Sequence, residues 1–355
     1  MAQPAKRIAV AMSGGVDSST AAALLCDQGY DVFGVHLRVM DAPAQSQAAP
    51  GADARRVAEA LGIEFHELDI RDAFRHDVIE PFIAAYLMGQ TPNPCVACNR
   101  AIKFGRLLEQ AQAWGAEALA TGHYARVEQG AERWRLLRGR AGDKDQSYYL
   151  SRLRQDQLAR FIVPLGDMDK PAVRALARQR SLPVAAKTDS QDVCFIPEGD
   201  YRRFLESWAP DRLNASEGDI VDTAGHVIGR HRGAWRYTIG QRRGLGVAAA
   251  QPLYVVAIDM AANRVVAGPK EATYATQCQV RDVNWVSIAP IRAPLECQVQ
   301  IRYRHVAAPA VAEPLDAPAS RLRIRFAAPQ SAITPGQAAV LYAGEAVLAS
   351  GWIEP

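Results

Sequence analysis

The chain has 355 residues, of which 49% are hydrophobic and 22% are charged, a balance typical of a soluble globular enzyme. This length favours two or three domains, and no apolar run approaches the roughly 20 residues that a membrane-spanning helix needs. The net charge of +3 is too small to predict nucleic-acid binding by itself, and six cysteines in so long a chain do not indicate a disulfide framework. The N-terminal apolar run is only as long as a strand and leaves no room for a signal peptide, so we expect a cytoplasmic protein.

The N-terminal segment predicts a strand, a glycine turn and a helix. Residues 8–12 are mostly apolar, and Ser13-Gly14-Gly15 leads into a helix start with hydroxyl groups at residues 18–20. Glycines let backbone N–H groups approach an oxyanion, and the N-terminal end of a helix carries partial positive charge. The turn therefore predicts a phosphate or pyrophosphate site. It matches neither G-x-x-x-x-G-K-[ST] nor G-x-G-x-x-G, the two commoner phosphate loops.

Asp17 places a carboxylate beside this predicted anion site. An acid there repels phosphate unless a cation neutralises it, so Asp17 is the candidate magnesium ligand. The next strand, residues 32–37, ends without the acid that would hold a ribose hydroxyl in a dinucleotide site.

Strand and helix patterns alternate through the first 125 residues. Helices are predicted at 52–61, 74–87 and 101–114, and strands at 64–68 and 118–121. This alternation predicts an α/β domain, a parallel sheet covered by helices, with ligands at the carboxyl ends of the strands. From residue 145 to about 208 the pattern is mainly helical, including a helix at 171–180.

Past residue 208 the pattern changes to short strands separated by turns. The first group comprises 219–222, 227–229, 254–259 and 264–267, and the second comprises 277–283, 296–304, 321–326 and 338–342. These groups predict a small β-rich middle domain and a C-terminal β-barrel. We place the three domains at residues 1–208, 209–275 and 276–355.

Two strands of the second group alternate apolar and basic side chains. Over residues 296–304, one face carries Cys297, Val299, Ile301 and Tyr303, and the other carries Gln298, Gln300, Arg302 and Arg304. Period-2 alternation predicts that the first set is buried and that the second forms a basic outer face. Residues 321–326 repeat the pattern. A basic barrel surface suits a phosphate backbone, although a solvated sheet face has the same pattern.

Two segments carry cysteines in settings that suggest chemistry. Cys95 and Cys98 lie in a proline-stiffened loop before the helix predicted at residue 101, whose N-terminal end should stabilise a thiolate. The Cys-x-x-Cys pattern alone admits zinc, a redox pair or an iron–sulfur site, and zinc is disfavoured because no second ligand pair follows. Cys194 lies in a second loop flanked by acids, where burial without function is the alternative. The other three cysteines, Cys26, Cys278 and Cys297, are assigned to packing.

Residues 13–18 resemble the pyrophosphate loop of the ATP pyrophosphatases, which release pyrophosphate from ATP and leave an adenylated substrate. Together with Thr-Pro-Asn-Pro-x-x-x-Cys-Asn at 91–99 and Asp-x-Cys-Phe-Ile at 192–196, the chain resembles the bacterial tRNA-specific 2-thiouridylases, which place sulfur on the wobble uridine of certain tRNAs. Further motifs agree in order at 120–124, 144–148, 240–246, 302–304 and 334–337. The resemblance therefore spans essentially the whole chain.

This resemblance implies that ATP adenylates O2 of the target uracil and that sulfur then displaces AMP. Cys194 would carry the sulfur as a persulfide received from a sulfur-relay partner, and Cys98 would close a disulfide with Cys194 as the sulfur leaves. ATP would be bound by Ala11, Met12, Ser13, Gly14, Gly15, Val16, Asp17, Ser18, Leu37 and Gly122. The target base would be contacted by Asn93, Pro94 and Cys95, and the rest of the tRNA by His123, Lys144, Asp145, Gln146, Arg302, Tyr303 and Gln337.

One departure from the family pattern supports an alternative mechanism. Many relatives have Asp at the position of Cys95, so this chain offers a third thiol beside Cys98 and Cys194. Three thiolates suit an iron–sulfur cluster with one open iron, which makes cluster-dependent thiolation the alternative. Two other function classes compete. An ATP pyrophosphatase acting on a small acceptor leaves the loop cysteines and the barrel unexplained, and a tRNA-binding module without catalysis leaves the intact phosphate loop unexplained.

Overall fold

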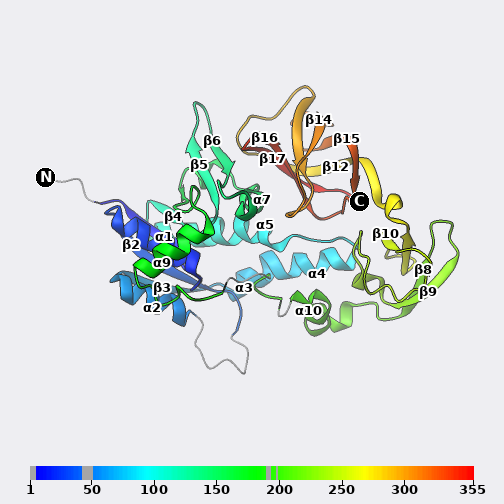
Figure 1. Ribbon diagram of the computed structural model, residues 1–355, viewed down its shortest axis with the longest axis horizontal. Coiled ribbons are helices and arrows are strands. Elements are labelled where there is room, and N and C mark those ends of the chain that lie inside the picture. Colours follow the sequence, from blue (N-terminus) through cyan, green and yellow to red (C-terminus); the bar gives the residue numbers. More distant parts are fainter. Residues whose placement is uncertain (1–4, 42–50, 189–192, 197–198) are drawn as a thin grey trace.

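The computed structural model describes residues 5–41, 51–188, 193–196 and 199–355. Its N-terminal part is built on a five-stranded parallel sheet in the order β3-β2-β1-β4-β7. The strands are β1 (Arg7–Ala11), β2 (Asp31–Arg38), β3 (Glu64–Asp69), β4 (Ala118–Ala120) and β7 (Phe161–Ile162). The predicted parallel sheet is confirmed (Figure 1).

Alternate residues of β1 point into two separate cores because the sheet is covered on both faces. Ile8 and Val10 pack with residues of α1 (Val16–Asp27) and α2 (Ala52–Leu61). Ala9 packs on the opposite face with the helical segment that contains Phe104. That second core continues into barrel residues such as Val340, so the sheet and the barrel share one packed interior.

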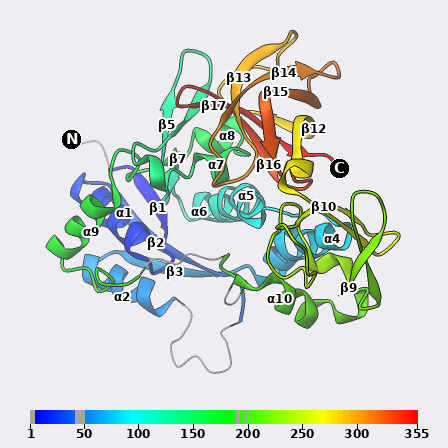
Figure 2. The same ribbon diagram turned by 45° about the vertical axis from the view of Figure 1, so that its right-hand side comes forward.

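Two long helical runs connect the sheet to the other domains. The first comprises α3 (Arg71–Phe74), the π-helical η1 (Arg75–Ile79) and α4 (Glu80–Leu87), and the second comprises α5 (Pro94–Cys98), the π-helical η2 (Asn99–Leu107) and α6 (Leu108–Ala113). Figure 2 shows α5 and α6 between the parallel sheet and the barrel. The second run begins seven residues before the predicted start at residue 101, because Pro94 occupies its first turn, where a missing N–H removes no helical hydrogen bond.

The remaining helices are short. They are α7 (Ser147–Leu150), α8 (Gln155–Leu158), α9 (Lys170–Gln179) and α10 (Tyr201–Trp208), with 3₁₀ turns η3 (Gly142–Lys144), η5 (Pro210–Arg212), η6 (Ala234–Arg236) and η7 (Lys270–Thr273). The sequence patterns missed a hairpin of β5 (Ala125–Gln129) and β6 (Trp134–Arg138), and β6 pairs with the barrel strand β17. No helix within the described residues is long and apolar enough to cross a membrane.

The middle domain is a four-stranded sheet in the order β10-β11-β8-β9. Its strands are β8 (Glu217–Val221), β9 (Val227–Arg232), β10 (Tyr254–Asp259) and β11 (Arg264–Gly268), close to the predicted ranges. Ile220, Val255 and Val265 form its small core. Met260 also packs against the core beneath α4, which attaches this domain to the end of the first helical run (Figure 1).

The C-terminal domain is the predicted β-barrel. Its strands are β12 (Tyr274–Trp285), β13 (Leu295–Gln300), β14 (Ala308–Pro314), β15 (Leu322–Ser331), β16 (Ala338–Ala343) and β17 (Ala346–Ile353). They follow the order β12-β15-β14-β13-β16-β17, and pairing of β12 with β17 closes the six strands into a barrel. The sequence patterns missed β14 and β17.

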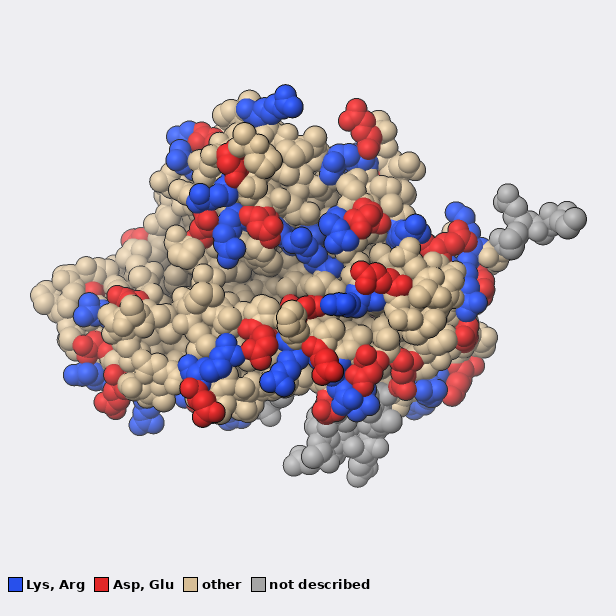
Figure 3. Space-filling model, turned by 180° about the vertical axis from the view of Figure 1, so that it is seen from behind, with Lys and Arg blue, Asp and Glu red and all other residues tan. Residues whose placement is uncertain are grey.

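The prediction of a strand through residue 304 is wrong, because β13 ends at Gln300. This side chain is buried rather than exposed, and its Nε2 donates to the carbonyl of Arg302 at 3.2 Å, which stabilises a turn over the following residues. In β15 the alternation is confirmed, but the outer arginines are partly neutralised, since Arg325 pairs with Glu313. Figure 3 likewise shows Lys and Arg intermixed with Asp and Glu on the face seen from behind.

Candidate active site

The candidate site lies where the strand order of the parallel sheet reverses. Strands β2 and β4 flank β1 on opposite sides, and open α/β sheets bind ligands at the carboxyl ends of strands at such a switch point. The turn after β1 carries the predicted phosphate loop, and the turn after β4 carries Gly122 and His123. The strand β2, which contains Leu37, ends at the same edge.

The phosphate loop has a geometry that leaves backbone N–H groups for an anion. Gly14 adopts φ +73°, a conformation that favours glycine, and Gly15 is the N-cap of α1 and has no side-chain oxygen to cap the first turn. The hydroxyls of Ser18 and Ser19 instead donate back to the Gly15 carbonyl, at 3.2 and 2.9 Å. Our expectation of hydroxyl caps in this turn is therefore corrected, and the helix N-terminus suits a phosphate.

Gly122 brings the end of β4 directly against this loop. A Cβ atom at this position would lie 2.6 Å from the backbone nitrogen of Ser18 and 2.6 Å from the carbonyl carbon of Asp17. Any side chain would therefore push the two segments apart. Beyond Gly122, the ring nitrogen Nδ1 of His123 lies 2.6 Å from Oγ1 of Thr121.

Asp17 already has a cationic partner in the protein. Nζ of Lys170 lies 2.7 and 2.8 Å from its two carboxylate oxygens, and the hydroxyl of Tyr124 donates to it at 2.8 Å. Lys170 is only 9% exposed, at the start of α9. Because protein donors occupy both carboxylate oxygens, Asp17 does not fit a magnesium ion in this arrangement, and we derive no step through one.

A second lysine also contacts the phosphate loop. Nζ of Lys187 donates to the carbonyl of Gly14 at 3.0 Å and pairs with Asp53 at the start of α2. Neither Lys170 nor Lys187 was predicted as a site residue, since both lie more than 150 residues from the loop and no local pattern marks them.

Cys95 and Cys98 lie within a helix rather than in a loop before it. Asn93 is the N-cap of α5, and its Oδ1 accepts from the backbone N–H of Val96 at 3.4 Å. Burial raises the pKa of Cys95 to about 11 and that of Cys98 to about 12. The expected stabilisation of the thiolate is therefore corrected, because loss of hydration outweighs the helix N-terminus.

The second cysteine segment packs against the first. Phe195 and Ile196 are buried in the same core that Cys98 borders, and the ring of Phe195 meets that of Phe82 on α4 edge to face at 5.3 Å. Cys194 itself is exposed, yet the surrounding protein raises its pKa. A charge on Cys194 raises the pKa of both Cys95 and Cys98. The fold thus brings the three thiols into one region. Residues 189–192 of the loop predicted around Cys194 lie outside the described residues.

The three thiols do not form a metal site in this arrangement. Within the described ranges, no group of three or more His, Cys, Asp or Glu side chains is placed to hold a metal ion. All six cysteines are free thiols. The residues therefore do not fit an iron–sulfur cluster here, and we derive no step through one.

The barrel contacts the segment that carries Cys95 and Cys98. Nε2 of Gln337 donates to the carbonyl of Thr91 at 2.8 Å, and the N–H of Thr91 donates to the carbonyl of Pro335 at 2.9 Å. The ring of Tyr303 stacks on that of Tyr149 in α7 with centroids 4.3 Å apart. Burial and the neighbouring Cys95 raise the pKa of Tyr149. The turn that carries Tyr303 therefore lies near the thiols.

The segment of Lys144, Asp145 and Gln146 is largely engaged inside the protein. Asp145 is buried, and its carboxylate accepts from Arg138 at 2.7 Å and from the hydroxyl of Ser147 at 2.9 Å. Gln146 forms hydrogen bonds to the backbone of Tyr124 through its own N–H and its Oε1. Lys144 is half-buried. These residues hold the turn after β4 against the barrel side of the site.

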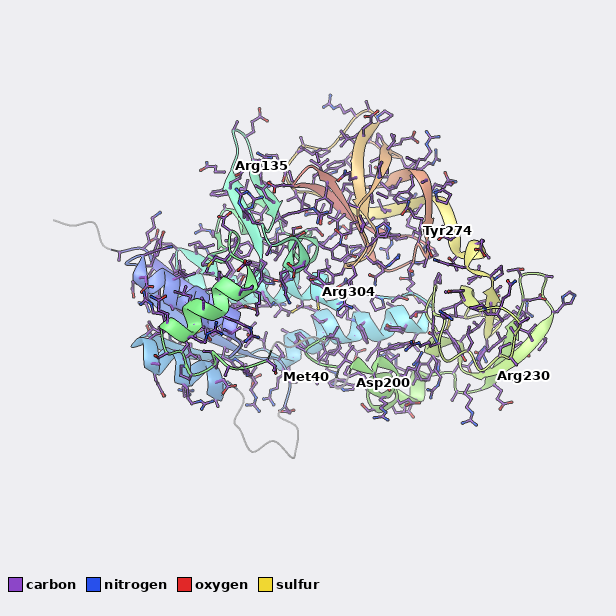
Figure 4. The ribbon with its side chains drawn as sticks, viewed as in Figure 1. Met40, Arg135, Asp200, Arg230, Tyr274 and Arg304 are labelled. Atoms are coloured by element: carbon purple, nitrogen blue, oxygen red, sulfur yellow. The ribbon has the colours of Figure 1, made fainter. Side chains whose placement is uncertain are left out.

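Arg302 and Arg304 lie in the turn that follows β13, called the barrel turn below, and they differ in what they contact. Arg302 is half-buried, and its Nη1 donates to the carbonyl of Ser331 at 3.0 Å. Arg304 is exposed, and it appears between the barrel and the helices α4 and α5 in the view of Figure 4. Arg304 was assigned to an outer strand face, but it lies in the turn after β13 instead.

Comparisons with known proteins cover all three domains. Family models match residues 6–198 as "tRNA methyl transferase HUP domain", 204–269 as "tRNA methyl transferase PRC-barrel domain" and 275–353 as "Aminomethyltransferase beta-barrel domain". Proteins named tRNA-specific 2-thiouridylase MnmA are similar over their whole length. The one from Heliobacterium modesticaldum is 50% identical over 98% of this chain and 92% of its own, and that from Syntrophotalea carbinolica is 49% identical over 99% and 100%.

A solved structure of the U34-tRNA thiolase NcsA from Methanococcus maripaludis is more distantly similar. It is 18% identical, with a TM-score of 0.36, over 59% of this chain and 68% of its own. That likeness is too weak to bear on the site.

Proposed function

The chain belongs to the tRNA-specific 2-thiouridylase family, and from this premise we propose that it uses ATP to place sulfur on C2 of the wobble uridine of tRNA. The observation that supports this most is how the segments lie together. The phosphate loop after β1 meets the turn after β4 at one edge of the sheet, and the core that both cysteine segments border also contacts Leu37, near the end of β2 at the same edge.

The chemistry needs an activated base and a sulfur nucleophile. O2 of the uracil attacks the α-phosphorus of ATP, which forms the O–P bond and releases pyrophosphate. The terminal sulfur of a persulfide on Cys194 then attacks C2, and AMP leaves with O2. Cys98 attacks the inner sulfur of that adduct, which frees the thiocarbonyl and leaves a Cys98–Cys194 disulfide. A thiol reductant reduces the disulfide, and a sulfur-relay protein restores the persulfide.

We assign the phosphates of ATP to the loop from Ala11 to Ser18 and its adenosine to Leu37 and Gly122. The target base is assigned to Asn93, Pro94 and Cys95, at the start of α5. The other tRNA contacts are assigned to His123, Lys144, Asp145, Gln146, Arg302, Tyr303 and Gln337, with Arg304 added. Burial lowers the pKa of His123 well below its usual value, with Lys103 contributing, so this residue would act as a neutral hydrogen-bonding group.

The test is pyrophosphate release and 2-thiouridine formation by the purified chain with ATP, a persulfide donor and tRNA. We expect both products with a tRNA that has uridine at the wobble position and neither with a matched tRNA that has cytidine there. Pyrophosphate release with a small amide-forming acceptor and no tRNA would favour the small-acceptor enzyme. Tight tRNA binding without measurable ATP binding would favour the non-catalytic module.

The two arginines of the barrel turn give a prediction on tRNA affinity. Arg304→Ala should lower the slope of log Kd against log salt by about one, because an exposed guanidinium contributes one phosphate contact. Arg302→Ala should lower the slope less, since its guanidinium already binds the carbonyl of Ser331. Filter binding from 50 to 300 mM salt, about the range in which such slopes are resolved, measures both variants. If neither variant changes the slope relative to the unmodified chain, the barrel turn lies outside the tRNA interface.

A further inference from the structure

The motif Gly-Gln-Arg-Arg-Gly-Leu-Gly at residues 240–246 has no role in the chemistry described so far. It lies in the middle domain, between η6 and β10, and Arg242 and Arg243 are both exposed. Residues 223–258 contain no Asp or Glu. No carboxylate of the described residues forms an ion pair with either arginine, whereas the guanidinium of Arg236 is paired. The motif therefore presents two uncompensated positive charges.

The turn that carries these arginines is fixed by the protein itself. Oε1 of Gln241 accepts from the backbone N–H of Thr238 at 3.2 Å, and its Nε2 donates to the carbonyl of Arg243 at 2.8 Å. Gly244 and Gly246 have φ of +77° and +69°, a region that favours glycine. The glycines of the motif are therefore required by the shape of the turn, and the arginines extend from a defined backbone.

A cavity of about 630 Å³ lies against this turn. It is lined by Arg242 and by residues 244–253. The backbone N–H groups of residues 246–251 donate no hydrogen bond to any acceptor in the part of the chain that the structure describes. Turns that contain left-handed residues direct such N–H groups into anion-binding concavities. With a guanidinium on its wall and no carboxylate in its lining, the cavity suits an anionic ligand.

The motif also adjoins the barrel turn. A Cβ atom at Gly240 would lie 2.6 Å from the Cβ atom of Ala332, which follows β15 of the barrel. The carbonyl of Ala332 in turn accepts from Nη1 of Arg302 at 3.4 Å. The two domains also meet at η7, which packs against β10 and β15 (Figure 1). The motif and the barrel turn thus lie on two sides of one barrel residue.

We propose that residues 240–253 form a binding site for the phosphate backbone of tRNA. The guanidinium groups of Arg242 and Arg243 and the free backbone N–H groups donate to phosphodiester oxygens, and the site continues the surface that begins at the barrel turn. The identity of the RNA rests on the proposed function. Phosphate contacts fix the register and orientation of a nucleic acid without reading its sequence. The middle domain therefore orients the tRNA while the wobble uridine is held at the sheet domain.

The test measures tRNA binding to the full chain by filter binding from about 50 to 300 mM salt, and it needs neither ATP nor a sulfur donor. Arg242→Ala and Arg243→Ala are made singly and together, and Arg242→Lys with Arg243→Lys keeps both charges. Arg264→Ala is the matched control, because Arg264 is exposed and lies opposite Asp259 at the far end of the β10–β11 hairpin from the motif.

We expect each single alanine variant to lower the slope of log Kd against log salt by about one, and the double variant to lower it by about two. The double alanine variant should also raise Kd roughly tenfold at physiological salt, about 150 mM. The double lysine variant should keep the slope, since it keeps both charges. Arg264→Ala should have the slope of the unmodified chain, and ATP affinity measured in parallel checks that each variant is folded.

Three results would overturn the proposal. The first is an unchanged slope in the double alanine variant, and the second is an equal loss in Arg264→Ala, which would indicate a general effect of charge. The third is normal tRNA binding by the double alanine variant with slower thiolation from a sulfur-relay protein but not from inorganic sulfide, which would assign the surface to that protein. Absence of thiolation by the unmodified chain would contradict the proposed function, whereas the expected slopes would still support the RNA site.

Discussion

Cys194→Ser and Cys98→Ser are each expected to abolish 2-thiouridine formation, by at least about a thousandfold, whereas Cys95→Ser should retain substantial activity. Without Cys194 no residue carries the persulfide. Without Cys98 the sulfur adduct on Cys194 is not resolved. Cys95 has no bond to form or break in this route, and serine replaces its half-buried side chain with a group of similar size.

The measurement is 2-thiouridine per tRNA after digestion, with oxygen excluded and again in air, together with ATP and tRNA affinity for each variant. Unchanged affinities show that a loss of product is chemical rather than structural. A cluster mechanism predicts a different pattern, because all three thiolates would be ligands. An inactive Cys95→Ser variant with normal affinities, whose iron and sulfide content falls together with its activity, would contradict the persulfide route.

Burial raises the pKa of Cys98 to about 12, which favours the neutral thiol in the free protein. A site that kept a reactive thiolate at all times would be oxidised or alkylated between turnovers. We therefore expect the free protein to protect Cys98 as a neutral thiol and to ionise it when the substrates change its surroundings.

Much of the fold follows from local sequence patterns. The helix at residues 52–61 has the predicted bounds because glycines stand on both sides of an amphipathic stretch. Strand β10 is also confirmed as predicted. The start of α5 was missed, because Pro92 and Pro94 were interpreted as loop residues, although proline also fits the first turn of a helix.

The candidate site was only partly predictable. Its motifs are short and continuous in the sequence, whereas the charged partners of its residues come from distant parts of the chain. Gly14 and Gly122 could be singled out, yet the packing of Gly122 against the phosphate loop depends on the order of β1 and β4 in the sheet. The partner of Asp17 lies 153 residues away, so no spacing rule reveals it.

Asp17→Ala should abolish pyrophosphate release and leave tRNA affinity within a few-fold. The carboxylate is a partner of Lys170, whose side chain is 11% exposed, and the substitution takes this partner away from a nearly buried cation beside the phosphate loop. Loss of one partner of a buried pair costs about 3–5 kcal/mol, and about 2–3 kcal/mol here because the Asp17 side chain is 32% exposed and solvent screens it. Asp17 lies on α1 and Lys170 on α9, both in the sheet domain rather than in the barrel, which is why tRNA binding serves as the control.

A double-mutant cycle on Asp17 and Lys170 distinguishes pairing of the carboxylate with Lys170 from binding of magnesium by the carboxylate. If Asp17 acts through Lys170, then Lys170→Met leaves an uncompensated carboxylate beside the phosphates and weakens ATP binding, by roughly tenfold or more. The double variant Asp17→Asn with Lys170→Met removes both charges and should recover part of the activity that either single variant loses. A magnesium ligand predicts the reverse, because Lys170→Met would free the carboxylate and the double variant would be as inactive as Asp17→Asn. Pyrophosphate release and ATP affinity of the four proteins at 1 and 10 mM magnesium therefore decide which partner the carboxylate serves during adenylation.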